Sequence, residues 1–136
     1  YYAVVNRKPD PLSGKLTNFL IKNSKKNISR IQQSDKKGAK KSVLEYELGA
    51  GLNGYFLLKI NPITGRPHQI RVQLSNIGCP IVGDLKYGYS RGTQDKSICL
   101  HCNELSFIHP IKKEKIVIEA EMPRKQYWDF FTDLVS

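Results

Sequence analysis

Residues 61–88 contain the side chains whose types and spacing could do chemistry. The pattern predicts a helix over residues 67–76, because the proline at its start suits a first helical turn and apolar residues follow at helical spacing. His68 and Arg71 would then lie on one face near the helix N-terminus, with Arg66 in the preceding loop. Such a positive helix end can hold an anion, either a phosphate or a carboxylate. Spacing alone favours a plainer interpretation, in which the helix start is solvated and Arg71 pairs with a structural acid.

Two strings in this region carry a family resemblance. GRPHQIRVQL (residues 65–74) and IGCPIVGDLKYG (residues 77–88) resemble the third motif of the RluA family of pseudouridine synthases, which modify large-subunit ribosomal and transfer RNA. Residues 1–5 are similar to the family's Y-x-A-x-V strand, and residues 105–110 to its L-x-F-x-H-P hairpin. Residues 37–41 resemble an insert of compact bacterial members. The resemblance covers nearly the whole chain.

The resemblance implies roles for particular residues. Arg71 would be the arginine that pairs with the catalytic aspartate, and Tyr1 the tyrosine that stacks against the flipped uracil and could move a proton. Arg66, His68 and Gln69 would shape the site or touch RNA. The family's nucleophile lies in an H-R-L-D-R-type motif before the tyrosine, and the 136 residues contain no such motif. We therefore expect the catalytic aspartate upstream of Tyr1, and we expect the chain alone to be inactive.

The implied reaction explains why these residue types are needed. The bond from C1′ to N1 of uridine breaks, the base turns, and it rejoins through C5 with help from a carboxylate that must stay ionised beside a cation. Arg71 can be that cation. The flipped base also needs an aromatic wall and a basic rim, which Tyr1 and the lysine-rich surface could supply. Because the reaction involves neither redox chemistry nor hydrolysis, no metal or organic cofactor is expected.

The charge of the chain points to a polyanionic partner. Its 22 Lys and Arg against 12 Asp and Glu give a formal charge of +10 and a pI near 9.6. RNA is the expected partner, because each neutralised phosphate releases counterions. Arg66 and the basic loop are expected to contact phosphates; the loop lysines concerned are Lys36, Lys37, Lys40 and Lys41. The alternative function is a noncatalytic RNA-binding module that uses the same basic face.

Length and cysteine content bound the class of protein. A chain of 136 residues with 40% hydrophobic content suits one domain, and the resemblance implies that residues 1–136 are the C-terminal portion of a pseudouridine synthase catalytic domain. Three cysteines suggest free thiols in a reducing compartment, so a cytoplasmic protein is expected, and no apolar run is long enough to span a bilayer.

Cys99, His101 and Cys102, with Cys79, could suggest zinc. In a strand, however, Cys99 and Cys102 point to opposite faces, so no metal site is expected.

Several strands and few helices predict an α+β fold, with a mixed, mostly antiparallel sheet flanked by a few helices. The turn signal Asn53-Gly54 predicts a hairpin between two of the strands. Besides the helix over residues 67–76, a short helical turn is expected over residues 15–22 and a closing amphipathic helix over residues 124–134, with Trp128 half exposed. Strands are expected over residues 1–5, 42–48, 55–60, 97–108 and 115–121, with an exposed strand and basic loop over residues 25–41.

Overall fold

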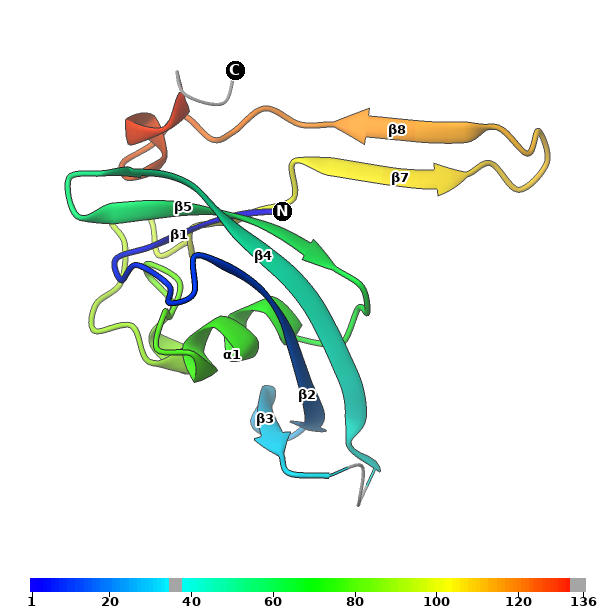
Figure 1. Cartoon of the computed structure of the whole chain (residues 1–136), viewed down its shortest axis with the longest axis horizontal. Coiled ribbons are helices and arrows are strands. Elements are labelled where there is room, and N and C mark those ends of the chain that lie inside the picture. Colours follow the sequence, from blue (N-terminus) through cyan, green and yellow to red (C-terminus); the bar gives the residue numbers. More distant parts are fainter. Residues whose placement is uncertain (35–37, 133–136) are drawn as a thin grey trace.

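The protein is described by a computed structural model that covers residues 1–34 and 38–132. Its main element is a six-stranded sheet with the order β3-β2-β4-β5-β1-β6, shown in Figure 1. The α+β prediction is confirmed, and every pair among the described strands is antiparallel. The strands of this sheet are β1 (Tyr2–Val5), β2 (Ser13–Asn23), β3 (Ile28–Gln32), β4 (Lys40–Leu52), β5 (Tyr55–Pro62) and β6 (Leu100–His101).

The predicted helical turn over residues 15–22 is wrong, because this segment lies inside β2. Leu16 and Leu20 fit a helical spacing of four, but four is also a multiple of the strand period of two. β2 pairs with β3 along one side and with β4 along the other. Pairing on both sides outweighs the local pattern, as tertiary context commonly does for short segments.

The predicted hairpin between β4 and β5 is confirmed. Asn53 and Gly54 form its turn with φ values of 56° and 80°, which suits the two left-handed positions of a tight hairpin turn. Both strands extend beyond their predicted bounds, and the pairing shifts register between Leu48 and Ala50. The long β4 strand curves along the sheet and reaches the end where β3 lies (Figure 1).

The predicted helix is present as α1 (Gln69–Asn76), and it lies against one face of the sheet (Figure 1). Leu74 is fully buried in the main core, which also contains Leu57 of β5 and Phe131 from the C-terminal segment. Nearer the start of α1, Val72 packs with Leu20 of β2 in a second buried cluster. The helix is therefore fixed against the sheet by apolar contacts at several points.

The C-terminal part differs from its prediction. The strand expected over residues 97–108 is divided into β6 and β7 (Glu104–Ile108), and β7 pairs with β8 (Lys115–Glu119) in a separate two-stranded sheet. This β7–β8 hairpin projects away from the main sheet (Figure 1).

No continuous closing helix forms over residues 124–131. That stretch contains only the short 3₁₀ helix η3 (Trp128–Phe130), and the rest of the predicted helix, including Leu134, lies outside the described residues. Tyr127 has φ 72°, which interrupts an α-helix at that point. Trp128 is 3% exposed, so the expectation of a half-exposed ring is also wrong. It packs edge-on against His101, which places the indole in the core.

Candidate functional site

The loop before α1 is held by the side chain of Gln69. Its Oε1 accepts hydrogen bonds from the Arg66 backbone N–H at 3.0 Å and from the Thr64 hydroxyl at 2.7 Å, and its Nε2 donates to the Val43 carbonyl at 2.9 Å. Gln69 is 3% exposed. A buried amide with these three hydrogen bonds shapes the loop before α1, and contact of Gln69 with RNA stays a prediction.

Arg71 forms a two-pronged ion pair with Asp84. Its Nε and Nη2 groups donate to the two carboxylate oxygens, each at 2.8 Å. The Asp84 side chain is 1% exposed and that of Arg71 is 19% exposed. Hydrogen bonding to Asp84 raises the pKa of Arg71 above its ordinary value, so the guanidinium stays charged. This pairing matches the structural acid that spacing alone favoured, while pairing with a catalytic aspartate stays a prediction.

The turn that carries Asp84 requires a glycine. Gly83 has φ 88°, and a Cβ at that position would lie 2.7 Å from the Ser97 carbonyl oxygen. Asp84 then leads into the 3₁₀ helix η2 (Leu85–Tyr87). The aspartate is thus placed by backbone that accepts no other residue type without a shift. Asp84 lies in the second family string, but its sequence position does not indicate that it pairs with Arg71.

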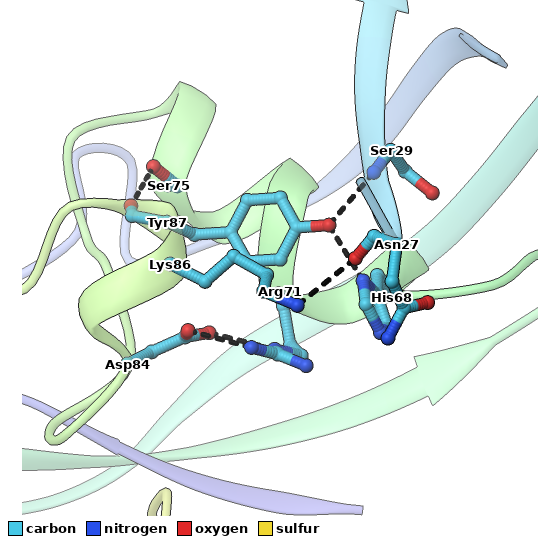
Figure 2. A network of polar contacts seen from close by, with 8 residues as sticks. All are labelled: Asn27, Ser29, His68, Arg71, Ser75, Asp84, Lys86 and Tyr87. Atoms are coloured by element: carbon cyan, nitrogen blue, oxygen red, sulfur yellow. Dashed lines mark hydrogen bonds and ion pairs between the residues drawn. The ribbon is translucent and has the colours of Figure 1, made fainter. Parts of the chain in front are cut away.

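Tyr87 contacts both Arg71 and His68, and Figure 2 shows its hydroxyl bonded to His68 and Ser29. The Arg71 guanidinium carbon lies 4.9 Å from the centre of the Tyr87 ring, within the range of a cation–π contact. The Tyr87 hydroxyl accepts a hydrogen bond from the Ser29 backbone N–H at 2.9 Å and lies 2.7 Å from His68 Nδ1. Because it already accepts from Ser29, the hydroxyl is best placed to donate to His68. His68 is then neutral with its proton on Nε2.

The surroundings of His68 keep it neutral. Burial is the largest cause that lowers its pKa from 6.5, and the positive charges of Arg71, Lys86 and Lys22 lower it further. His68 has φ 56° and is the residue before the first turn of α1, where its side chain makes no capping hydrogen bond. The predicted same-face pair of His68 and Arg71 therefore does not form within the helix. Tyr87 nevertheless brings the two side chains into one network.

Tyr1 projects from the same side of the sheet as α1. Its backbone N donates to the Ile60 carbonyl at 3.0 Å, and the Ile60 N donates to the Tyr1 carbonyl at 2.8 Å. Facing residues of an antiparallel pair share a side. Ile60 faces Tyr46, and that side of the sheet continues to Leu20, which clusters with Val72 of α1.

The immediate surroundings of Tyr1 are distinct from those of Arg71. Tyr1 is 38% exposed and lines a hollow of about 940 Å³ between the sheet and the base of the β7–β8 hairpin, and Arg71 is not among its lining residues. Burial, and then the neighbouring Cys102, raise the pKa of the Tyr1 hydroxyl above 10.0. The roles of Tyr1 and Arg71 in one active site remain predictions.

The other predicted RNA contacts are distributed along one end of β4. Arg66 Nε donates to the Lys41 carbonyl at 3.1 Å, so these two residues are neighbours. Lys40 and Lys41 are exposed at the start of β4. Lys36 and Lys37 lie outside the described residues.

The part of the chain that the structure describes contains no group of three or more His, Cys, Asp or Glu side chains arranged to hold a metal ion. Cys79 and Cys99 are buried free thiols and Cys102 is exposed. Within the same described ranges, no helix is both long and apolar enough to cross a membrane.

Comparison with known proteins gives consistent matches. The family described as RNA pseudouridylate synthase matches residues 1–76. Ribosomal large subunit pseudouridine synthase C of Rickettsia prowazekii is 34% identical over 125 residues, covering 90% of this chain and 41% of that protein. Ribosomal large subunit pseudouridine synthase D of Zymomonas mobilis is 33% identical over 132 residues, covering 91% of this chain and 41% of that protein. The chain thus spans about two fifths of the length of these relatives.

Solved structures share the fold. Human RNA pseudouridylate synthase domain containing 1 superposes with a TM-score of 0.70 at 26% identity, covering 88% of this chain and 52% of that one. Human RNA pseudouridylate synthase domain containing 4 superposes with a TM-score of 0.69 at 21% identity, covering 90% and 57%.

Proposed function

Because this chain belongs to the RNA pseudouridylate synthase family, we propose that it is the C-terminal portion of a catalytic domain that isomerises uridine to pseudouridine in RNA. The observation that carries the proposal is the family match over residues 1–76, which includes both Tyr1 and Arg71. The proposed reaction is balanced within the nucleotide. The C1′–N1 bond breaks, a C1′–C5 bond forms, and the proton on C5 is lost while N1 gains one.

The proposed nucleophile is an aspartate outside these 136 residues, since no H-R-L-D-R-type motif occurs within them. Arg71 is proposed to contact that carboxylate. Its Nε and Nη2 already donate to Asp84, while no described residue accepts a hydrogen bond from its Nη1. Nη1 is therefore the donor proposed for the nucleophile.

This geometry refines what Arg71 can contribute. A guanidinium whose charge is already shared with Asp84 offers the nucleophile an oriented hydrogen bond more than an uncompensated positive charge. Asp84 and the Tyr87 ring hold the guanidinium plane from two directions. A fixed donor costs little reorganisation when charge develops during the reaction, which is the condition for effective electrostatic catalysis. Tyr1 is proposed to stack on the flipped uracil.

The proposed substrate is large-subunit ribosomal RNA, because relatives at 33–34% identity over most of this chain carry that substrate in their names. Transfer RNA is the alternative substrate. The protein is proposed to act in the cytoplasm, where its three free thiols would stay reduced.

The test uses the full-length protein and RNA labelled with tritium at C5 of uridine. Pseudouridine formation replaces the C5 hydrogen, so the proposal expects tritium release that depends on the protein. Ribosomal and transfer RNA assayed separately distinguish the two substrates. Full-length protein that binds RNA without tritium release would instead identify a noncatalytic RNA-binding module.

A further inference from the structure

One end of the main sheet concentrates positive charge. The segment 16–44 contains eight Lys or Arg and one acid, Asp35, and six of the eight basic residues lie in the part that the structure describes. All six are exposed, and together they are called the basic end here: Lys22, Lys25, Lys26, Arg30, Lys40 and Lys41. They belong to β2, β3, the start of β4 and the turn between β2 and β3, at the end of the sheet beside α1 (Figure 1).

The side chain of Asn23 orders the turn between β2 and β3. Asn23 Oδ1 accepts hydrogen bonds from the backbone N–H groups of Lys25 at 3.1 Å and Lys26 at 3.3 Å. This is the arrangement by which asparagine stabilises a tight turn. The backbone of both lysines is thereby fixed while their side chains stay exposed. Binding a partner to these lysines therefore costs less conformational entropy than binding it to a loop without such bonds.

The same turn is tied to the candidate site. Lys86 Nζ donates to the Asn27 carbonyl at 3.0 Å, and the Ser29 hydroxyl donates to the Pro67 carbonyl at 2.8 Å. The Ser29 backbone N–H donates to the Tyr87 hydroxyl that also contacts His68 (Figure 2). These bonds join segments that are far apart in sequence. The β2–β3 turn and the surroundings of Arg71 are thus held in fixed positions relative to each other.

Among the described residues, no acid forms an ion pair with a member of the basic end. The two ion pairs among the described residues are Arg71 with Asp84 and Lys125 with Asp95, and neither includes a member of the basic end. The effect reaches the candidate site, where Lys22 is one of the cations that lower the pKa of His68. Clustered like charges without partners are stabilised by a polyanion, because binding releases its condensed counterions.

We propose that the basic end is a docking surface for the phosphate backbone of the RNA next to the target uridine, with Lys25 and Lys26 at its outer edge. The proposal rests on the proposed function, and it extends the RNA contacts expected from sequence to the β2–β3 turn. RNA is the partner that fits, because the surface joins a site with a fixed guanidinium and a neutral histidine donor. Phosphates bound along the turn would set the direction in which the strand enters that site.

The test is a pair of matched double variants of the full-length protein. Lys25→Ala with Lys26→Ala removes two exposed lysines of the β2–β3 turn, and Lys112→Ala with Lys113→Ala removes two exposed lysines between β7 and β8. Each variant loses two exposed lysines from the connection between two paired strands. The variants therefore differ only in where on the protein the charge is lost. No side chain among these four makes a hydrogen bond or ion pair within the described residues, so both variants should melt at the wild-type temperature.

RNA affinity is measured by filter binding across a range of salt concentrations. The Lys25 and Lys26 variant should lower the slope of log K against log salt by about 1.4 to 1.8, and it should bind roughly tenfold or more weakly at about 0.1 M salt. The Lys112 and Lys113 variant should keep the wild-type slope. The single-turnover rate at saturating protein should be unchanged in the Lys112 and Lys113 variant, because it alters neither the basic end nor Arg71.

The outcomes separate this proposal from the proposed function. An equal loss of RNA affinity in both variants would show that only net charge matters, and it would overturn the docking surface. Unchanged RNA binding in the Lys25 and Lys26 variant also overturns it, and it assigns the basic end to a different partner, such as an acidic protein. Wild-type protein that releases no tritium yet shows the expected difference in binding refutes the proposed function and keeps the docking surface.

Discussion

The ion pair between Arg71 and Asp84 allows a sharp test by substitution. Arg71→Ala removes both hydrogen-bond donors of a carboxylate that is 1% exposed, and it leaves that charge without its partner. Breaking a buried pair in this way typically costs about 3 to 5 kcal/mol of the free energy of unfolding. Because the Arg71 side chain is 19% exposed, water can partly replace it. We therefore expect a loss near the lower end, about 3 kcal/mol.

The measurement is urea unfolding of the full-length protein, with Asp84→Ala and the double variant completing a mutant cycle. The double variant should lose less stability than the sum of the two single variants, because it leaves no unpaired buried charge. Lys125→Ala is the matched control. It breaks the other described ion pair, in which the side chains are 50% and 48% exposed, so it should change stability little. Arg71→Ala with wild-type stability would refute the buried pair and the account of Arg71 built on it.

The same variants test the catalytic geometry. Arg71→Lys keeps the positive charge but loses the planar guanidinium that binds both Asp84 oxygens. It should therefore recover little of the stability and activity that Arg71→Ala loses. Asp84→Asn keeps Arg71 but removes the charge that orients it, and we expect a lower single-turnover rate with little change in RNA affinity. Loss of affinity without loss of rate would show that Asp84 does not position a reacting group.

Three further predictions concern the isolated chain, Arg66 and His68. The 136-residue chain alone should release no tritium from labelled RNA, because it lacks the proposed nucleophile; turnover by this chain would place the nucleophile within it. Arg66→Ala should raise the apparent KM and reduce the salt dependence of RNA binding, with an unchanged single-turnover rate at saturation. The pKa of His68 is lowered in the folded protein, so the unfolded state binds more protons below about pH 6.5. The free energy of unfolding should therefore fall between about pH 7 and pH 5, with a smaller fall in His68→Gln; parallel curves for the two proteins would contradict this.

Local turn chemistry made part of the fold predictable. The Asn53-Gly54 turn and the helix after Pro67 both follow from backbone preferences that act over a few residues. β2 was not predictable in this way, because its strand character depends on partners on both sides that the local sequence does not reveal. Trp128 was misjudged for the same reason, since its burial comes from contacts with distant strands.

The candidate site was also only partly predictable from the sequence. Arg71 and His68 could be identified from their types and spacing, and Arg71 from its place in the family motif. Asp84 and Tyr87 occur in the second family string, but they lie 13 and 16 positions after Arg71 in the sequence. Ser29, which connects the basic end to Tyr87, carries no motif at all and is separated from it by 58 residues.

The Arg71–Asp84 pair changes what the sequence pattern means chemically. A motif arginine read alone suggests a free cation that keeps a nucleophilic carboxylate ionised. With Asp84 already bound to two of its nitrogens, Arg71 offers a third donor in a fixed direction and only part of its charge. Two carboxylates that share one guanidinium repel each other, so removing the charge of Asp84 should lower the pKa of the nucleophile. Asp84→Asn should therefore move the acid limb of the pH–rate profile to lower pH while the maximal rate falls, whereas a purely structural aspartate would lower the rate without moving that limb.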